Sequence, residues 1–260
     1  MRPMRALLVA LVMVAASAPA FGWSRDGHRL SCAIALDVIS PSTRAAAFEI
    51  LEIDRSEQFL DLCSWADRVK ATQPETAPWH SMLLPRGATS IDVARDCPEP
   101  KSCVLNRVVQ EISTLKSDAP RDQKATALKL LMHLIADLHQ PLNLGFADDE
   151  GGKKIAATFL GQPSTLHEIW ETKLLEADRA APDSAHETLW LAHEVQTHPA
   201  PLDWARESFF IMRSPATGYI GNPGGLPFDE RYVQQNRPIA MGQLEKAGVR
   251  LGLTLNDALR

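Results

Sequence analysis

The sequence predicts an all-α protein, a single-domain helical bundle with a minor β-ribbon. Apolar residues recur at helical spacing along almost the whole chain. No internal repeat or low-complexity linker divides the chain, and its length suits one domain with a sizeable core. A strand is expected only as a short segment, Ile155–Leu160.

Residues 1–22 have the pattern of a cleaved signal peptide rather than of a folded element. Arg2 and Arg5 precede an apolar run over residues 6–18, which is too short to span a bilayer. Ala20 and Gly22 stand where a signal peptidase reads small side chains. We therefore expect a secreted or periplasmic protein whose mature domain covers residues 23–260 and begins at Trp23. No second apolar run reaches spanning length, so no transmembrane anchor is expected.

The charge of the mature chain limits its function. Residues 1–22 carry two of the 27 basic residues and none of the 32 acidic ones, which leaves a formal net charge of −7. A passive nucleic-acid binder needs a basic face to displace counterions from phosphates, so this class is disfavoured. An enzyme whose positive charge arrives as bound metal remains compatible with this charge.

The four cysteines of an exported chain favour two disulfides. Cys97 and Cys103 lie in one Pro- and charge-rich loop and would close a small ring. Cys32 and Cys63 would then tie two helical segments together. Four cysteines permit three connectivities, and the sequence leaves the alternatives open.

The expected helices follow from apolar periodicity and from helix-ending residues. They are Asp26–Ile39, Thr43–Leu51, Ser56–Lys70, Asn106–Lys116, Pro120–His139, Ser164–Asp178, Asp183–Thr197, Leu202–Met212 and Asn236–Leu259. A long loop is expected over Ala71–Lys101 and a turn over Asp148–Gly152.

The helix expected from Pro120 to His139 carries two polar residues on an otherwise apolar surface. His133 and Asp137 are four residues apart and share one helix face. A buried carboxylate is costly unless it is paired or coordinated. The two explanations are a histidine–carboxylate hydrogen bond in the core and a metal site. His139 is expected to orient a ligand or to cap the helix.

His167 and Glu171 repeat this spacing on the next long helix, although surface helices often carry such pairs. His28, His80 and Asp67 are each ordinary in isolation, and Asp67 could simply pair with Arg68 or Lys70. Helical bundles, however, assemble metal sites from single ligands on several helices, and imidazole with carboxylate suits zinc. The combination therefore indicates a zinc site.

Several ordered motifs resemble those of the S1/P1-type zinc-dependent nucleases, a family related to zinc-dependent phospholipase C. The motifs are Trp23-Ser-Arg-Asp-Gly-His28, Cys63-Ser-Trp-Ala-Asp67-Arg, Trp79-His80, His133-Leu-Ile-Ala-Asp137-Leu-His-Gln-Pro-Leu, Leu166-His167-Glu-Ile-Trp170, Trp204-Ala-Arg-Glu-Ser208 and Gln243-Leu-Glu-Lys-Ala-Gly-Val-Arg-Leu. No single motif is unique, but the ordered set covers nearly the whole mature chain. The resemblance implies a phospholipase C/P1 nuclease-like helical fold, and the Cys32–Cys63 pairing is similar to one in plant members.

The resemblance implies a two-zinc cluster at these residues. The first zinc would have four side-chain ligands, Asp67, His80, His133 and Asp137. The second would have the backbone amine and carbonyl of Trp23, the side chain of His28 and a shared Asp137. Only cleavage after Gly22 creates that free amine. Asp67 and Asp137 would thus be catalytic, because two such ions lower the pKa of a bridging water that attacks phosphorus.

A third zinc position is where the chain departs from the family. Asn143 stands where the family has histidine, Glu171 stands where it has aspartate, and only His167 matches directly. A neutral amide oxygen is a weaker zinc ligand than imidazole. We therefore expect this third position to be weak, labile or empty.

The segment expected to bind a base also departs from the family. Ser81-Met82-Leu83-Leu84 follows His80 where the family places an aromatic residue and then Asn or Asp. Ser81 and Leu83 are thus the candidate substrate-binding positions, without the stacking that contributes about 1–3 kcal/mol per base. Lys70 could reach a substrate phosphate as a catalytic residue, or it could be a solvated surface lysine.

The favoured function is zinc-dependent hydrolysis of single-stranded DNA or RNA by an endonuclease that yields 5′-phosphorylated products and also acts as a 3′-nucleotidase. One alternative is a zinc phospholipase C-type phosphodiesterase, which Glu171 and the missing aromatic residue favour. Another is a degenerate zinc-binding protein without activity, which Asn143 and Ser81 favour. No stable protein partner is implied, and the chain is expected to be a monomer.

Overall fold

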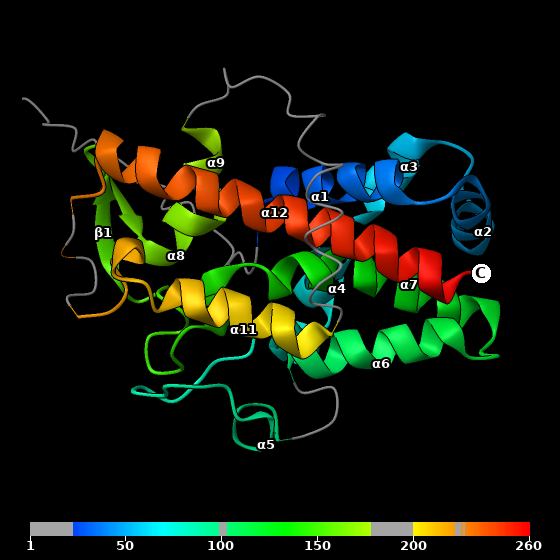
Figure 1. Ribbon diagram of the computed structural model, residues 1–260, viewed down its shortest axis with the longest axis horizontal. Helices are drawn as coiled ribbons and strands as arrows, with labels where there is room; N and C mark the ends of the chain where they lie inside the picture. The colour runs from blue at the N-terminus through cyan, green and yellow to red at the C-terminus, as the bar shows by residue number, and fades with distance from the viewer. Residues whose placement is uncertain (1–22, 99–102, 178–199, 222–224, 226) are drawn as a thin grey trace, which may run out of the picture.

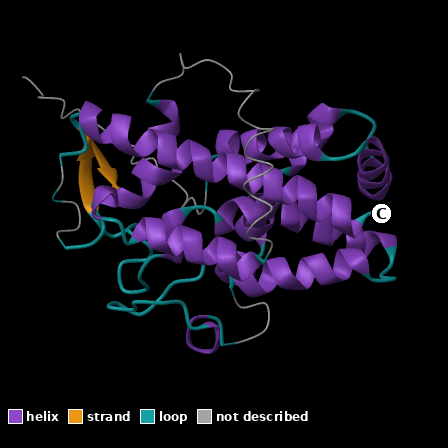
Figure 2. Ribbon diagram, in the orientation of Figure 1, coloured by secondary structure: helices purple, strands orange, loops and turns teal. Residues whose placement is uncertain are grey.

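The protein is a bundle of α-helices with one small β-ribbon at its edge (Figures 1 and 2). The computed structural model describes residues 23–98, 103–177, 200–221, 225 and 227–260. The α-helices of this part are α1 (Arg25–Val38), α2 (Pro41–Leu51), α3 (Ser56–Leu62), α4 (Trp65–Thr72), α5 (Val93–Asp96), α6 (Val104–Lys116), α7 (Arg121–Leu138), α8 (Leu166–Glu168), α9 (Leu174–Glu176), α11 (Pro201–Met212) and α12 (Glu230–Ala258). The 3₁₀-helical segments are η1 (Pro74–His80), η2 (Pro141–Leu144) and η4 (Pro215–Thr217), and η3 (Ile169–Lys173) is π-helical. The expected all-α class is confirmed.

Helix α7 is the central element of the bundle. Its last twelve residues are almost all buried, and it contacts α1, α2, α4, α6, α11 and α12. The helix predicted over Pro120–His139 agrees with the bounds of α7, Arg121–Leu138, to within one residue at each end. Its apolar residues fill the core, so the polar His133 and Asp137 are buried with them.

Helices α1 and α12 lie side by side, blue and red in Figure 1, because glycines in α12 let the two backbones approach closely. A Cβ atom on Gly248 would lie 2.5 Å from the carbonyl oxygen of Ser31 and 2.6 Å from Cβ of Ile34. A Cβ atom on Gly252 would lie 2.6 Å from Cβ of Val38. This close packing fixes the position of α1 and of the polar residues that α1 carries.

Both expected disulfides are present. Cys32–Cys63 joins α1 to the end of α3, with the two Cα atoms 6.5 Å apart and both residues fully buried. Cys97–Cys103 closes the small ring expected in the loop before α6, with a Cα separation of 5.6 Å. The alternative connectivities are thereby excluded.

The single helix predicted over Ser56–Lys70 is wrong, because the chain breaks at Cys63 and Ser64 into α3 and α4. The break frees the carbonyl of Cys63, which accepts a 2.7 Å hydrogen bond from Nδ1 of His133. The segment Ala71–Lys101 was predicted as one long loop, but it contains the helical segments η1 and α5. Propensity did not reveal these breaks because tertiary contacts determine them.

The β-ribbon is an antiparallel pair of β1 (Ala156–Phe159) and β2 (Gln162–Thr165), of which only the first strand was predicted. Leu160 and Gly161 connect the strands with φ values of 47° and 80°, as a tight hairpin turn of this hand requires. Phe159 and Phe228 are bridged, so the ribbon is joined to the chain just before α12.

The helix predicted over Ser164–Asp178 is interrupted by a π-helical turn, η3, between α8 and α9. Such turns are frequent at functional sites, and this one carries Glu171. Helix α12 begins six residues before the predicted start at Asn236, since Asp229 caps it by accepting a bond from the Tyr232 amide. The helix predicted over Asp183–Thr197 lies outside the described residues. Within the described residues, no helix combines the length and the apolar character needed to cross a membrane.

Candidate metal centre

Five of the predicted ligands meet in the middle of the bundle. His28 comes from α1, Asp67 from α4, His80 from the end of η1, and His133 with Asp137 from α7. The four residues other than Asp67 are at most 1% exposed. The Asp67 side chain is 32% exposed, so it marks the side on which solvent reaches the cluster.

The carboxylate of Asp137 directs its two oxygens to different partners. Oδ2 lies 2.8 Å from Nδ1 of His80 and 3.2 Å from Nε2 of His133. Oδ1 lies 3.6 Å from Nε2 of His28. Asp67 Oδ1 completes the first side, at 3.6 Å from His133 Nε2 and 3.9 Å from His80 Nδ1. This arrangement allows one carboxylate to be shared between two cations.

The orientation of His133 follows from the break between α3 and α4. Its Nδ1 donates to the carbonyl of Cys63, which leaves the Nε2 lone pair directed at the carboxylates. His28 stacks on His133 with ring centroids 3.7 Å apart and an interplanar angle of 16°. The Cys32–Cys63 disulfide and the hydrogen bond from His133 to Cys63 thus help to fix the positions of the stacked imidazoles of His28 and His133.

Trp23 is buried against the same cluster, with an exposed fraction of 1%. Its indole Nε1 donates a 2.9 Å hydrogen bond to the carbonyl of Ala136, the residue before Asp137. The amide of Ser24 donates to the carbonyl of Glu171 at 3.1 Å. The first residues of the described chain are therefore fixed between α7 and η3.

Burial and mutual charge set the protonation of this cluster. Burial, with the neighbouring His133, lowers the pKa of His28 to about 3. Burial alone would raise the pKa of Asp137, but His133 and His80 hold it well below its ordinary value. Burial opposes a charge on His133, but Asp137 and Asp67 raise its pKa. A neutral His28 and an ionised Asp137 are the forms that bind metal ions.

The unsatisfied polar atoms of the cluster fit a cation. Both ring nitrogens of His28, Nε2 of His133 and Oδ1 of Asp137 are buried without a hydrogen-bond partner. Leaving such atoms unpaired costs about 1–3 kcal/mol each, which coordination would offset. Within the described residues, two sets are close enough to hold an ion: His28 with Asp67 and His133, and His80 with His133 and Asp137. These residues could hold a metal, and their nitrogen and oxygen donors suit zinc.

The residues expected at a third position are also close to the cluster but differ in chemistry. His167 Nδ1 donates to the carbonyl of Gly151 at 2.8 Å, and its Nε2 is buried and unpaired. Asn143 Nδ2 donates to the carbonyl of Asp137 at 3.0 Å, and its Oδ1 is buried and unpaired. Glu171 is 4% exposed. Among the described residues, these do not belong to a set of three ionisable ligands.

Lys153 is the charged neighbour that the sequence analysis missed. Burial raises the pKa of Glu171 to about 8, and Lys153 acts in the opposite direction. Burial likewise lowers the pKa of Lys153 to about 8, against the attraction of Glu171. Each residue therefore offsets part of the cost that burial imposes on the charged form of the other. A lysine directly after Gly151-Gly152 and shortly before His167 was the available signal.

Lys70 and the segment after His80 lie at the edge of the cluster. Lys70 Nζ is 2.6 Å from Asp67 Oδ1 and its side chain is 10% exposed, so it is not a solvated surface lysine. Ser81 and Leu83 are half-buried. Their segment lies along η2, since the amide of Met82 donates to the carbonyl of Asn143 at 2.9 Å.

The family model described as S1/P1 Nuclease matches residues 23–260. The chain belongs to the S1/P1 nuclease family. Endonuclease 2 of Arabidopsis thaliana is 26% identical, over 96% of this chain and 95% of its own. Nuclease S1 of Aspergillus oryzae is 29% identical, over 66% of this chain and 61% of its own. Nuclease P1 of Penicillium citrinum is 29% identical, over 58% and 57%.

Family membership makes the chain a nuclease, a hydrolase of phosphodiester bonds in nucleic acids. It favours this function over the phospholipase C alternative. The family match begins at Trp23, the residue whose indole is bonded beside Asp137.

His139 lies outside the candidate metal cluster of this S1/P1-family nuclease. Its Nδ1 bonds the carbonyl of Ile135 at 2.7 Å, and its Nε2 accepts from Arg250 at 2.7 Å. Arg250 is held in turn by Glu207 at 2.9 Å. Both ring nitrogens are thus engaged, and His139 caps the end of α7 as expected.

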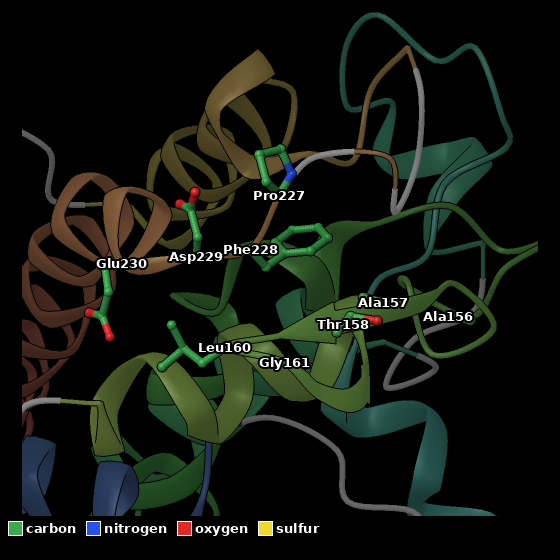
Figure 3. Close-up of a pocket in the computed structure, with 9 residues that line it drawn as sticks. All are labelled: Ala156, Ala157, Thr158, Leu160, Gly161, Pro227, Phe228, Asp229 and Glu230. Carbon is green, nitrogen blue, oxygen red and sulfur yellow. The ribbon is translucent and has the colours of Figure 1, made fainter.

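A surface hollow of about 600 Å³ lies beside the β-ribbon, and none of the candidate metal ligands is among its described lining residues (Figure 3). Its lining includes Thr158, Leu160 and Phe228, and its carboxylates are Asp229 and Glu230. Asp229 is occupied as the cap of α12. None of the described residues that line the hollow is a histidine or a lysine.

Proposed function

We propose that this nuclease cleaves single-stranded DNA or RNA internally, at a centre of two zinc ions that share Asp137. The carrying observation is that the two oxygens of Asp137 are directed to different histidines, His80 with His133 and His28. The proposal includes 5′-phosphorylated products and hydrolysis of 3′-nucleotides, in keeping with the family resemblance.

The ligand assignments follow the two sides of Asp137. Asp67, His80 and His133 would hold one ion with Oδ2, and His28 would hold the other with Oδ1. Bound zinc would supply an activated water and would neutralise phosphate charge. The chain's own contribution is to orient His133 through Cys63 and to keep the imidazoles neutral in a buried site.

The second ion would also need the amine and carbonyl of Trp23, so residues 1–22 would have to be removed. The indole bond to Ala136 supports this assignment because it places Trp23 next to Asp137. Gly27 supports it as well, since a Cβ atom at that position would lie 3.0 Å from Cβ of Trp23. Export through a signal peptide agrees with the two disulfides, which persist in oxidising compartments.

Lys70 would contribute positive charge at the open edge of the centre. Its ammonium pairs with Asp67, the most exposed of the candidate ligands. An incoming phosphate would compete for this ammonium, which has three donors and no acceptor. Ser81 and Leu83 would contact the nucleotide, without an aromatic side chain in their segment to stack on its base.

Circular single-stranded DNA tests this proposal because it has no ends. Protein purified from the exported form is first analysed for zinc and then incubated with the circle and, separately, with phosphatidylcholine. We expect two zinc ions per chain and linear DNA products. Asp137→Asn should lose zinc and cleavage, whereas Asp122→Asn, an exposed residue on the first turn of α7, should lose neither.

The other outcomes each contradict the proposal in a distinct way. Hydrolysis of phosphatidylcholine but not of DNA would establish the lipid alternative. Zinc-loaded protein that turns over neither nucleic acid, nucleotide nor lipid would establish a non-enzymatic zinc protein. Linear products from an Asp137→Asn variant without zinc would exclude the shared carboxylate.

A further inference from the structure

The three residues to which the family resemblance assigns a third zinc each offer a hydrogen-bond acceptor. These acceptors are the carboxyl group of Glu171, Oδ1 of Asn143 and Nε2 of His167. Asn143 Oδ1 and His167 Nε2 are buried without a hydrogen-bond partner. The other polar side-chain atom of each residue is hydrogen-bonded to a backbone carbonyl, Asn143 Nδ2 to that of Asp137 and His167 Nδ1 to that of Gly151. An amide oxygen is a poor ligand for zinc but a good acceptor for an N–H group.

Backbone hydrogen bonds hold the segment that carries Lys153 next to Leu166 and His167. The carbonyl of Gly152 accepts from the His167 amide at 3.3 Å, and the carbonyl of Ile155 accepts from the Leu166 amide at 3.0 Å. Gly151 also packs on η2, since a Cβ atom there would lie 2.4 Å from the Leu142 carbonyl oxygen. The backbone on both sides of Lys153 is thus held against the start of α8.

Among the neighbouring charges, that of Lys153 has the largest effect on the pKa values of Glu171 and His167. After burial, Lys153 is the largest influence on the pKa of Glu171, which it lowers, and on the pKa of His167, which it also lowers. Lys70 and Asp137 act on both residues more weakly. The Lys153 side chain is half-buried.

We propose that the ammonium of Lys153 replaces the third metal ion of this centre, excluding zinc there and binding a phosphate oxygen of the substrate. The inference rests on the proposed two-zinc function. An ammonium has three donors and no acceptor, which matches a carboxyl group, an amide oxygen and an imidazole lone pair, reached directly or through water. A phosphate oxygen of the substrate would take one of these three donors in place of a protein acceptor. A divalent ion at the same place would be repelled by this charge and poorly bound by Asn143.

Zinc stoichiometry tests the exclusion without any activity measurement. Full-length protein, processed on export, is equilibrated with a fixed concentration of free zinc, and bound metal is measured by mass spectrometry. The unsubstituted protein and Asn143→His should each bind two ions. Asn143→His combined with Lys153→Met should bind three, because the third position then has an imidazole and no ammonium.

Two further combinations with Asn143→His serve as controls. Lys153→Arg keeps the charge and should leave two ions. Lys154→Met removes the neighbouring exposed lysine, which pairs with Glu150 at 2.8 Å, and should also leave two. Circular dichroism confirms that each variant is folded.

Three results would overturn the inference: three ions in the unsubstituted protein, three in Asn143→His alone, or two in Asn143→His combined with Lys153→Met. A protein that binds no zinc at all would instead contradict the proposed function, so the two failures are distinguishable.

Kinetics on a short single-stranded oligonucleotide test the phosphate contact. Lys153→Met should raise KM by about tenfold, as expected for a lost charge-assisted hydrogen bond, with the zinc content unchanged at two. Lys153→Arg should recover part of this loss, and Lys154→Met should have little effect. An unchanged KM in Lys153→Met would refute the contact with the substrate.

Discussion

The Cys32–Cys63 disulfide is expected both to stabilise the fold and to position a candidate ligand, and a second disulfide provides a matched comparison. Cys32–Cys63 spans a sequence separation of 31 residues and Cys97–Cys103 a separation of 6. On the chain-entropy account, the longer loop contributes about 3.7 kcal/mol to the free energy of unfolding and the shorter about 2.2 kcal/mol. The Cys32→Ala/Cys63→Ala variant should therefore lose more stability than Cys97→Ala/Cys103→Ala.

The effect on metal binding should differ even more than the effect on stability. Cys63 also supplies the carbonyl that orients His133, and loss of such a supporting contact typically weakens metal binding by about 10–100-fold. The Cys97–Cys103 ring has no contact with a candidate ligand in the hydrogen bonds of the described residues. Zinc affinity should fall only in the first variant.

Guanidinium unfolding of the metal-free proteins measures the stabilities, and competition with a chelator measures the zinc affinities. Equal stability losses in the two variants would contradict the dependence on loop length. Unchanged zinc affinity without Cys32–Cys63 would show that the His133–Cys63 bond does not need the disulfide.

Three more predictions follow from the packing, the charges and the first described residue. Gly248→Val should lower the free energy of unfolding by about 1–3 kcal/mol in chemical denaturation, because its side chain has no space against α1, whereas Gly242→Ala, with nothing within 4 Å, should not destabilise the protein. In metal-free protein, nuclear magnetic resonance should find His133 titrating above 6.5 and His28 near 3. Since the pKa of His28 is lower in the folded state, its contribution to stability is present above pH 6.5 and declines as the pH falls below that value; its titration near 6.5 would refute this. Finally, one extra residue before Trp23 should reduce the zinc content from two ions to one, and an unchanged content would exclude the terminal amine as a ligand.

The helical fold was predictable from local sequence pattern, whereas the grouping of His28, Asp67 and His80 with His133 and Asp137 was implied by the family resemblance. His133 and Asp137 stand out on an apolar helix, and the close pairing of Asp137 with His80 and His133 agrees with that interpretation. The polar residue in an apolar context was therefore the informative signal.

Features that depend on tertiary contacts were not predictable in the same way. The break at Cys63 is accompanied by a hydrogen bond from His133, and the early start of α12 depends on the cap formed by Asp229. Lys153 was missed because its importance comes from a turn that brings it to Glu171, which no periodicity describes.

The burial of Trp23 has a practical consequence for handling the protein. Its indole is 1% exposed and bonded to Ala136, so the start of the described chain is part of the interior. The side chain of Arg260 at the other end is 78% exposed. An affinity tag or fluorescent label therefore belongs after Arg260, because a peptide fused ahead of Trp23 would be attached directly to a buried residue.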